Sequence, residues 1–295
     1  MRILLTGKHG QLGWELHRQL EQDYEVIALG REDIDFRDSK FMLSMLRSLP
    51  KCDLIVNAAA YTDVDKAERE PFLAEAVNAE APALLATEAD RRGIPMIHFS
   101  TNHVFSGRWR KSPYREMDRP NPMSCYGRTK LEGELRIKNI LEKHLIFRLS
   151  GLYGIRRRNF FTTMLSRNRS GISPRIANDQ FVSPNWAPLV AEVVACAIKR
   201  LLQDDRIPWG IYHLSGGGST TPYEFARLIF GKIRQVWGGN VLFPTPSASR
   251  ALRVSARRPK YSVLDSTHFN DTFHYALPGW YEQFLYFFGG LQPNL

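Results

Sequence analysis

Residues 1–13, MRILLTGKHGQLG, decide the fold of this chain. The run Arg2–Thr6 is short and mostly apolar, which predicts a buried β-strand. A helix is predicted over Gln11–Glu21, because leucines recur there at every fourth residue. Glycines mark the turn between the two. A strand, a glycine-rich turn and a helix in this order are typical of a dinucleotide-binding fold.

The glycines of this turn follow the spacing G-x-x-G-x-x-G. Glycine is needed where the backbone turns tightly, approaches a pyrophosphate or lets a helix pack closely on a strand. The start of the helix then offers unpaired N–H groups to phosphate oxygens. We therefore predict a cofactor site at Gly7, Gly10, Gln11, Leu12 and Gly13. An ordinary tight turn is the alternative interpretation.

Apolar and amphipathic segments alternate through the first half of the chain. Further strands are predicted at Glu25–Leu29, Asp53–Asn57, Pro95–Ser100, Leu145–Leu149 and Gly210–Leu214. Further helices are predicted at Phe41–Leu49, Pro71–Arg92, Tyr126–Leu141, Ala187–Leu202 and Trp280–Phe288. This alternation predicts an α/β fold, a doubly wound parallel Rossmann-type sheet with helices on both faces.

The alternation ends after about Gly151, where basic and polar residues run through Arg156–Arg169. The last third of the chain mixes glycine, proline and aromatic residues. We therefore expect a dinucleotide-binding domain over residues 1–152 and about 187–214. A smaller C-terminal substrate-binding lobe is expected over residues 153–186 and 215–295.

The composition is that of an ordinary globular protein, with 43% hydrophobic and 24% charged residues. No apolar run approaches the roughly 18 residues that span a bilayer, and the opening run is too short for a signal peptide. We expect a cytoplasmic protein with no membrane anchor. Cys52, Cys125 and Cys196 are too few and too widely spaced for a disulfide framework or a metal cage. A packing role is predicted for Cys125, and a place in the lining of a pocket next to Tyr126 is the alternative.

Two explanations of the net charge of +10 are an anionic partner and a contribution to solubility. The basic residues are scattered, with small clusters at Arg156–Arg158 and Arg257–Arg258. No zinc spacing or RNA-binding signature is present, so no nucleic-acid partner is expected. A nucleotide diphosphate is a sufficient anionic partner.

The end of the second predicted strand bears on the choice of cofactor. An acidic residue there binds ribose hydroxyls and favours NAD, but here Arg31 follows the strand within two residues. A cation suits the 2′-phosphate of NADP, and Lys8 is a second candidate cation. Because Asp33 and Asp35 lie nearby, NADPH is predicted with NADH as the alternative.

A tyrosine and a lysine, Tyr126 and Lys130, stand at i and i+4 of a predicted helix, so they share one face. A free tyrosine has a pKa near ~10, and a neighbouring ammonium lowers this pKa by favouring the phenolate. The pair predicts proton donation to a carbonyl oxygen as hydride reaches its carbon. An isolated pair of this spacing is otherwise a solvated helix face.

Thr101 follows the predicted strand Pro95–Ser100. Ligands bind at the carboxyl ends of strands in open α/β sheets, and a hydroxyl there is placed to bond a substrate oxygen that gains negative charge. A turn or a helix cap is the alternative for such a residue. Together with the glycine turn, Thr101, Tyr126 and Lys130 predict a catalytic site for carbonyl reduction.

Several segments carry a resemblance that runs nearly from end to end. They are Ile3–Leu16, Val56–Glu68, Ser100–Thr101, Val104–Phe105, Tyr126–Gly127, Thr129–Glu134, Asn178–Phe181 and Ala256–Pro259. The chain resembles the extended short-chain dehydrogenase/reductase superfamily and, more narrowly, the dTDP-4-dehydrorhamnose reductase family. The resemblance implies NADPH-dependent reduction of the C4 carbonyl of a dTDP-6-deoxy-hexulose, dTDP-4-dehydrorhamnose first among them.

The resemblance also implies roles for residues that match. Tyr126 would be the proton donor, Lys130 its partner and a ligand of the nicotinamide ribose, and Thr101 the hydroxyl on the carbonyl oxygen. The other implied contacts are Gly10, Gln11 and Leu12 at the pyrophosphate, Asp35 and Phe36 near the adenine, Ala60, Tyr61, Thr62 and Phe99 beside the nicotinamide, and Arg257 and Arg258 at the substrate.

Three departures from the family pattern concern the substrate side. Asn102 and His103 stand where the family usually has Asp-Tyr, Gly151 stands where a relative has tryptophan against the sugar, and Val182–Asn185 replace a Gly, small, Pro, Thr run. We treat Asn102, His103 and Gly151 as candidate substrate contacts, with a packed histidine as the alternative for His103. The identity of the sugar stays open.

Two other functions stay open as well. One is a related sugar-nucleotide 4-ketoreductase or an epimerase acting on a different sugar. The other is a non-catalytic regulatory subunit like that of methionine adenosyltransferase, which resembles the same family. Some relatives form dimers with magnesium at the interface, and Glu15 stands where one such ligand would lie. A glutamate on a helix face is the default interpretation, so no metal is assigned, and a homodimer is an expectation only.

Overall fold

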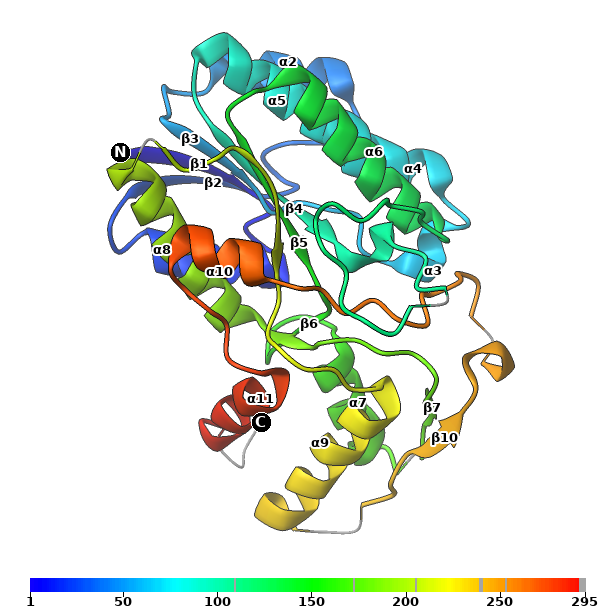
Figure 1. Ribbon diagram of the computed structural model, residues 1–295. Coiled ribbons are helices and arrows are strands. Elements are labelled where there is room, and N and C mark those ends of the chain that lie inside the picture. Colours follow the sequence, from blue (N-terminus) through cyan, green and yellow to red (C-terminus); the bar gives the residue numbers. More distant parts are fainter. Residues whose placement is uncertain (109, 172, 205, 239–240, 253, 292–295) are drawn as a thin grey trace.

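Figure 1 shows a computed structural model of the chain, which describes residues 1–291 except 109, 172, 205, 239–240 and 253. The strands of its central sheet are β1 (Arg2–Thr6), β2 (Glu25–Leu29), β3 (Leu54–Asn57), β4 (Met96–Thr101), β5 (His144–Leu149) and β9 (Gly210–Leu214). They form a six-stranded sheet in the order β2-β1-β3-β4-β5-β9. Every neighbouring pair is parallel, which confirms the doubly wound α/β prediction and the return of β9 to the sheet.

The direction of the strand order reverses between β1 and β3, because β2 lies on one side of β1 and all later strands lie on the other. Thr6 at the end of β1 is paired with both Leu29 and Asn57. Open α/β sheets bind ligands in the crevice beyond the carboxyl ends of the strands at such a reversal. The predicted glycine turn starts directly at this point.

Helices cover both faces of the sheet (Figure 1). One face carries α1 (Gln11–Leu20), α8 (Ala187–Gln203) and α10 (Thr267–Phe273), and the other carries α2 (Ser39–Ser48), α5 (Ala81–Arg92) and α6 (Cys125–Ile140). Ile3 and Leu5 of β1 pack on the first face and Leu4 on the second. Successive strand residues point to opposite faces, and both faces are buried here. Each fully buried aliphatic side chain contributes about 1.5–3 kcal/mol.

The predicted helix Pro71–Arg92 is interrupted in the structure. It consists of α4 (Pro71–Glu75), a π-helical turn η1 (Ala76–Glu80) and α5. Such turns insert one extra residue and often occur at functional sites. Here the turn places Asn78 against the loop after β3. Its Oδ1 accepts from Tyr61 N at 2.8 Å and its Nδ2 donates to Tyr61 O at 3.1 Å. The other predicted elements match within two residues.

A third apolar cluster lies beyond the sheet, among α7 (Phe160–Arg169), α9 (Pro222–Trp237) and α11 (Trp280–Gly289) (Figure 1). The sequence analysis does not predict α7 or α9, although both carry local caps. Asn159 and Thr162 form a capping box on α7, and Thr221 caps α9 by accepting from Glu224 N at 3.1 Å. The smaller elements are α3 (Val64–Ala67), β6 (Leu152–Tyr153), β7 (Arg175–Ala177), β8 (Asn185–Trp186), β10 (Thr245–Ser247), η2 (Asn102–Val104) and η3 (Ser249–Ala251).

The C-terminal helix α11 is docked on this cluster. Phe284, Phe287 and Phe288 are buried, and the ring of Trp237 stacks on Phe288 with centroids 5.4 Å apart. Tyr281 lies on the exposed side of the helix. Within the described part of the chain, no helix has both the length and the apolar character needed to cross a membrane.

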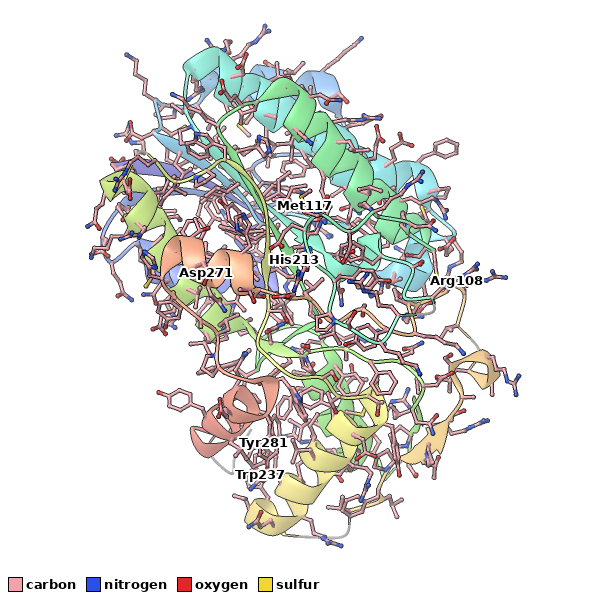
Figure 2. All side chains as sticks on the ribbon, in the orientation of Figure 1. Arg108, Met117, His213, Trp237, Asp271 and Tyr281 are labelled. Atoms are coloured by element: carbon pink, nitrogen blue, oxygen red, sulfur yellow. The ribbon has the colours of Figure 1, made fainter. Side chains whose placement is uncertain are left out.

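An ion pair is buried in the body of the sheet. Arg148 of β5 and Glu134 of α6 are 2% and 1% exposed, and Arg148 Nη2 lies 2.6 Å from Glu134 Oε2. Ser100 also donates its hydroxyl to Glu134. Arg148 Nη1 is 3.5 Å from Nε2 of His213, a residue in the middle of the molecule (Figure 2). Burial, with the charge of Arg148, lowers the pKa of His213 to about 3. This cluster joins β4, β5 and β9 to α6.

Candidate active site

The glycine turn brings backbone into contact with backbone. Gly7 has a φ of 82°, in the left-handed region, and its carbonyl accepts from Gly10 N at 2.8 Å. A Cβ on Gly13 would lie 2.1 Å from Gly7 O. Gly10 precedes α1 without a side-chain cap, which leaves the first N–H groups of the helix available to an anion. Leu12 is buried, and Gln11 Nε2 is buried with no hydrogen-bond partner among the described residues.

Gly13→Ala should therefore damage both the turn and cofactor binding. The added methyl group displaces the Gly7 carbonyl, and overpacking of this kind costs typically ~1–3 kcal/mol. Gly231→Ala in α9 is the matched control, because its Cβ meets nothing within 4 Å. That control should stabilise the protein by up to about 1 kcal/mol. Urea unfolding and NADPH fluorescence titration measure both effects. Unchanged NADPH affinity in Gly13→Ala would refute the assignment of the turn.

The basic segment Arg156–Arg158 covers this turn. Arg157 donates from Nε to the carbonyl of His9, and it has a φ of 58°, which a non-glycine residue rarely adopts. The guanidinium of Arg156 lies 3.8 Å from the ring centroid of Trp14 in α1. The cluster is thus placed beside the candidate phosphate site.

The residues that bear on cofactor choice lie after β2. Lys8 Nζ is paired with Asp33 Oδ2 at 2.7 Å and with Glu32 Oε1 at 3.0 Å. The Gly30 N–H and Lys8 both bond Asp33, and these bonds lower the pKa of its carboxyl group. Arg31 is exposed directly beside this cluster. Lys8 is therefore engaged by carboxylates, and Arg31 is the cation better placed to meet a 2′-phosphate.

The two residues predicted near the adenine are engaged with other parts of the protein. Asp35 binds the guanidinium of Arg37 with Oδ2 2.6 Å from Nη2, and this contact lowers the pKa of Asp35 to about 2. Phe36 packs against the core cluster on the α2 and α5 face. Both lie in the loop after β2. The glycine turn follows the neighbouring strand β1, at the same edge of the sheet.

The loop after β3 carries Ala60, Tyr61 and Thr62. Ala60 is half-buried, and Thr62 is exposed. Tyr61 packs with Tyr126 in a small apolar cluster. Its hydroxyl donates to Glu70 Oε2 at 2.7 Å, and burial together with this bond raises the pKa of Tyr61 to about 12. Tyr61 is therefore a fixed, neutral phenol at the edge of the site.

Tyr126 stands in the first turn of α6. The side chain of Ser124 caps the helix by accepting from Gly127 N at 3.1 Å, a contact that stabilises a helix by about 1 kcal/mol. A Cβ on Gly127 would lie 2.3 Å from the carbonyl of His103, so α6 touches η2 at this point. As a result, the rings of Tyr126 and His103 meet edge to face with centroids 5.6 Å apart.

Tyr126 lies beside Thr101. Burial raises the pKa of Tyr126, and the Thr101 side chain opposes this rise only in part. The sequence-based prediction that Lys130 lowers this pKa is wrong for the structure. Lys130 turns instead to β4, where Nζ donates to Phe99 O at 2.6 Å and lies 3.0 Å from Nε2 of His98. Tyr126 is thus a phenol at neutral pH, the form that can give a proton.

Lys130 is 1% exposed. Burial lowers the pKa of its amino group to about 8, and the charge of Glu134 opposes this shift. The ring of Phe99 points to the core, where it lies 6.1 Å from the ring of Phe147. Phe99 therefore contributes its carbonyl to Lys130, and its ring helps to build the sheet core.

The substrate-side candidates fall into two groups. Asn102 is buried, and its Nδ2 donates to Ser150 Oγ at 3.2 Å and to Ser262 O at 3.0 Å. It therefore joins β4, the end of β5 and the segment before α10. His103 differs, because its Nδ1 is buried and has no hydrogen-bond partner within the described residues. Burial, with the charge of Arg258, lowers the pKa of His103 to about 4.

Arg258 is held near His103 by Asp65, with Nη2 2.6 Å from Oδ2. Arg257 is exposed. Gly151 lies at the end of β5, is exposed, and has nothing within 4 Å of the position of a Cβ. The structure therefore brings His103 and Arg258 together with Tyr126 and leaves open space at Gly151.

Sequence reasoning missed several buried polar residues behind the site: Asn57, Asn78, His98, Glu134 and Arg148. A signal for them exists, because Asn57, His98 and Arg148 interrupt strands that are otherwise apolar. Buried polar groups need hydrogen-bond partners. The sequence reveals the need for a partner but not which partner is present.

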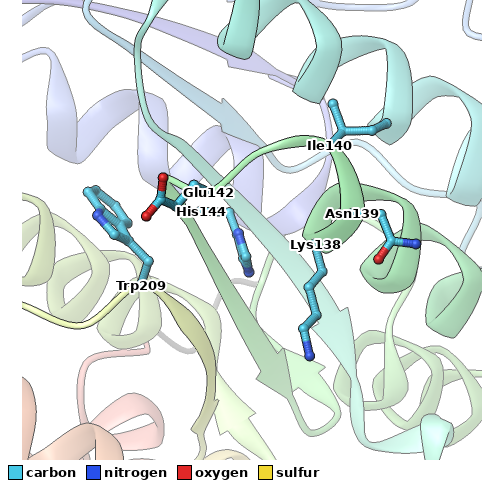
Figure 3. A pocket seen from close by; sticks show the side chains of 6 residues that line it. All are labelled: Lys138, Asn139, Ile140, Glu142, His144 and Trp209. Carbon is cyan, nitrogen blue, oxygen red and sulfur yellow. The ribbon is translucent and has the colours of Figure 1, made fainter.

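An open hollow of about 610 Å³ lies at the other end of the sheet (Figure 3). It is lined by Lys138, Asn139, Ile140, Glu142, His144 and Trp209. His144 starts β5 and Trp209 precedes β9, so the hollow lies at the amino-terminal edge of these strands. It is therefore separate from the candidate active site.

The structure offers no metal centre in the residues it describes, since no three histidine, cysteine, aspartate or glutamate side chains group suitably. Glu15 is 5% exposed on α1, and Arg18 Nη2 lies 3.5 Å from its carboxylate. Burial raises the pKa of Glu15. Among the cysteines, Cys52 and Cys125 are buried, which for Cys125 agrees with the predicted packing role, whereas Cys196 is exposed.

Comparison with known proteins points to one family. The model of the family described as "RmlD substrate binding domain" matches residues 1–289. The dTDP-4-dehydrorhamnose reductase of Salmonella typhimurium is 38% identical over 286 residues, 95% of this chain and 94% of the relative. The enzyme of that name from Escherichia coli is 39% identical over 287 residues, again 95% of this chain and 94% of the relative.

Solved structures of proteins with the same name are also similar to this chain. A dTDP-4-dehydrorhamnose reductase from Clostridium acetobutylicum superposes with a TM-score of 0.88 at 32% identity, covering 98% of this chain and 99% of the other. One from Bacillus anthracis, solved in complex with NADP, has a TM-score of 0.86 at 28% identity with the same coverage. A UDP-glucose 4-epimerase from Thermotoga maritima, at 21% identity, shares the fold alone, with a TM-score of 0.77 and coverage of 97% and 99%. The chain belongs to the dTDP-4-dehydrorhamnose reductase family.

Proposed function

We propose that this protein is an NADPH-dependent reductase that converts dTDP-4-dehydrorhamnose to dTDP-L-rhamnose. One observation carries the proposal: Tyr126, a phenol next to Thr101, stands at the carboxyl edge of a parallel sheet, on the same helix as the buried Lys130. The glycine turn opens on the same edge. The relatives of that name, 38–39% identical over 95% of the chain, support the substrate, and the NADP complex of the Bacillus anthracis relative supports the cofactor.

The residues of the glycine turn fit a dinucleotide. Gly10 leaves the start of α1 uncapped, and the buried Gln11 amide has no partner among the described residues. These N–H groups would hold the pyrophosphate, and Arg31 would meet the 2′-phosphate. Ala60, Tyr61 and Thr62 would lie beside the nicotinamide. When bound, NADPH supplies the hydride that reaches C4 of the sugar.

Two side chains of the protein supply the proton and stabilise the charge on the sugar oxygen O4. Tyr126 gives its phenolic proton to O4 as this oxygen gains charge, a contribution of typically ~10²–10⁴-fold for a well-placed acid. Thr101 donates a hydrogen bond to the same oxygen, which stabilises its developing charge in a site with little water. The bond from Lys130 Nζ to Phe99 O holds the lysine at the end of β4.

We assign the sugar nucleotide to the segments beyond the sheet, residues 153–186 and 215–295, as a second lobe. Arg258, fixed by Asp65, and the exposed Arg257 suit its diphosphate. The unpartnered Nδ1 of His103 suits a sugar hydroxyl, because a neutral imidazole nitrogen accepts a hydrogen bond. The open space at Gly151 leaves room for the sugar ring. Magnesium and a homodimer enter no step of this mechanism.

The test is oxidation of NADPH in the presence of dTDP-4-dehydro-6-deoxy-L-mannose, followed by the loss of NADPH absorbance. We expect turnover with this sugar and slower turnover with NADH, because Arg31 meets only the 2′-phosphate of NADPH. Reactions without sugar or without enzyme are the controls. Failure to oxidise NADPH with any dTDP-4-keto sugar would overturn the proposal.

A second candidate is a 4-ketoreductase for a different dTDP sugar. A relative from Streptomyces antibioticus, called a probable dTDP-4,6-dihydroxy-2-methyloxan-3-one 4-ketoreductase, is 36% identical over 285 residues, 95% of this chain. His103 and Gly151 lie on the substrate side of the site and depart from the family pattern, which favours this alternative. Turnover with another dTDP-4-keto sugar, but not with the L-mannose derivative, would support it.

A further inference from the structure

Two carboxylates of the short helix α3 each bind a part of the site that lies far away in the sequence. Asp65 stands in the helix, and Glu68 is the residue that ends it, in helical conformation. Side chains three residues apart lie on the same side of a helical turn. The mechanism above uses Asp65 only as the partner of Arg258 and gives Glu68 no role.

Asp65 binds the segment that precedes α10. Its Oδ1 accepts from the backbone N–H of Ala256 at 2.9 Å, and its Oδ2 accepts from Nη2 of Arg258 at 2.6 Å. Nη1 of Arg258 donates to Oδ1 of Asp65 at 3.3 Å and to the carbonyl of Ala256 at 3.2 Å. Paired bonds between a guanidinium and a carboxylate fix orientation as well as position. Asp65 therefore sets the direction in which Arg258 points.

The other side of the Arg258 guanidinium is left for a ligand. A guanidinium has five N–H donors in one plane, and the bonds to Asp65 and Ala256 use three of them. Within the described residues, Nε of Arg258 has no hydrogen-bond partner. Burial and the charge of Arg258 both lower the pKa of His103, so the arginine lies close to this residue of the site. Its remaining donors are thus available to the diphosphate assigned to it above.

Glu68 holds the beginning of α6. Its Oε1 accepts from the backbone N–H of Cys125, the first residue of that helix, at 2.8 Å. The first N–H groups of a helix have no partner inside it, and a carboxylate at this end also interacts favourably with the helix dipole. Ser124 binds the N–H of Gly127 in the same turn. Tyr126 lies between the two bonded residues, so these contacts fix the turn that carries the acid.

The helix that joins the two carboxylates is itself held in place. Ala67 is fully buried, and it packs in one apolar cluster with Cys125 and Tyr126. The side chain of Asp63 caps the helix by accepting from the backbone N–H of Lys66 at 3.0 Å. Helix α3 is therefore fixed against the start of α6, and a displacement of one carries the other with it.

These contacts form a closed ring around the place where a substrate would bind. Helix α3 reaches Arg258 through Asp65 and Tyr126 through Glu68. His103 closes the ring, because it lies near Arg258 and its own ring meets that of Tyr126. We infer that Asp65 and Glu68 are positioning residues that set the place of Arg258 relative to Tyr126. The consequence for turnover rests on the proposed function, whereas the two sets of contacts do not.

A purely structural role for the two carboxylates makes a different prediction. Loss of either one would then lower the stability of the protein and reduce every activity alike. Positioning predicts that the effects separate. Asp65 acts through Arg258 on binding of the sugar nucleotide, which appears in KM, whereas Glu68 acts through Tyr126 on proton transfer, which appears in kcat.

Asp65→Asn tests the first half of the inference. The amide oxygen still accepts from the N–H of Ala256, but the charge that pairs with Arg258 is gone. We expect KM for the sugar nucleotide to rise about tenfold or more with little change in kcat, because the contact serves substrate and transition state alike. The affinity for NADPH should not change, since the glycine turn lies on another element. An unchanged KM would overturn the role of Asp65.

Glu68→Ala and Glu68→Gln test the second half. Alanine leaves the N–H of Cys125 without its acceptor, and we expect kcat to fall about tenfold or more, because a small displacement of a reacting group costs up to ~10²-fold. Glutamine keeps an oxygen within reach of the same N–H and should retain most of the rate. Equal rates in the alanine and glutamine variants would overturn the role of Glu68.

Glu132→Gln is the matched control, because Glu132 is a carboxylate on α6 that is 45% exposed and pairs with Arg136 at the surface. It should leave KM and kcat unchanged. Urea unfolding of each variant shows whether it is folded. A fall in kcat in Glu132→Gln equal to that in Glu68→Ala would show that any loss of charge on α6 or α3 has this effect, which would also overturn the inference.

Hydrogen exchange tests the contact of Glu68 without turnover. The chain has three cysteines, so labelling with ¹⁵N-cysteine gives few amide signals, and Cys125→Ser identifies the one from Cys125 by its loss. Exchange of this amide should be about fivefold or more faster in Glu68→Ala than in the unaltered protein. It should change little in Glu68→Gln. The same exchange rate in Glu68→Ala and the unaltered protein would overturn the placement of α6 by Glu68.

Calorimetric titration with dTDP tests the contact of Asp65 in the same way, because dTDP has the diphosphate but no sugar to reduce. Binding should be about tenfold weaker in Asp65→Asn and unchanged in Glu68→Ala. Equal affinity in Asp65→Asn and the unaltered protein, or no binding by the unaltered protein, would overturn the role of Asp65. If both measurements succeed but no dTDP-4-keto sugar is reduced, the proposed function fails and the placement by Asp65 and Glu68 stands.

Discussion

Tyr126→Phe is expected to lower the turnover number of the reductase by roughly 10²–10⁴-fold, the usual contribution of a general acid. The substitution removes only the hydroxyl, which lies next to Thr101. The ring stays in its apolar cluster with Tyr61 and in contact with His103. Folding and NADPH binding should therefore be preserved, and the loss should appear in kcat rather than in cofactor affinity.

The measurement is steady-state NADPH oxidation together with a fluorescence titration of NADPH in the absence of sugar. Tyr281→Phe is the matched control, because this tyrosine is 48% exposed on α11. It should behave as the unaltered protein in both experiments. A Tyr126→Phe protein that reduces the sugar at the original rate would disprove the assignment of Tyr126 as the acid.

The direction of the pKa shift adds a pH dependence. Burial raises the pKa of Tyr126, so the phenol persists through neutral pH. Reduction should therefore fall only at alkaline pH, where the phenol loses its proton. Oxidation of the sugar alcohol needs the phenolate and should increase over that same range.

Arg148→Met should produce the largest loss of stability, about 3–5 kcal/mol in the free energy of unfolding. The arginine is 2% exposed, and its removal leaves the carboxylate of Glu134 buried without a cationic partner. Ser100 alone would remain bonded to that carboxylate. Because the cluster joins β4, β5 and β9 to α6, the loss should extend to the whole sheet.

Urea unfolding curves of paired variants check this expectation. In the double variant Arg148→Met with Glu134→Leu, neither charge of the pair remains, so most of the lost stability should return. Arg136→Met is the control on the same helix. Its bond to Glu132 is 2.8 Å long, but both side chains are at least one-third exposed, and such pairs contribute at most ~1 kcal/mol. Equal losses at Arg148 and Arg136 would contradict the role of the buried pair.

The parts of the fold that the sequence predicts are those set by local pattern. Gly7, Gly10 and Gly13 mark a turn that requires glycine at Gly7 and Gly13, and the leucines of α1 repeat at helical spacing. Asn57 and Thr101 are polar residues at the ends of β3 and β4, two strands that are mostly apolar. Local rules of this kind act within a few residues, and they place the glycine turn and the two strand ends at one edge of the sheet.

The features that the sequence does not predict depend on distant contacts. The alanine-rich segment around Asn78 has an ordinary helical period, so a single extra residue in η1 leaves no trace in it. The direction taken by Lys130 depends on His98, which lies 32 residues earlier in the chain. The expected lowering of the Tyr126 pKa by Lys130 is wrong for that reason. Spacing shows that two residues share a helix face, but it does not show which group a flexible lysine side chain binds.

Position 151, at the end of β5, has room for a side chain other than that of glycine. A Cβ added at Gly151 meets no atom within 4 Å, and the backbone there needs no positive φ. Single substitutions at this position can therefore be accepted without harm to folding. If the proposed roles hold, the choice of sugar can change at position 151 while Tyr126 and Thr101, on other elements, keep the chemistry of carbonyl reduction.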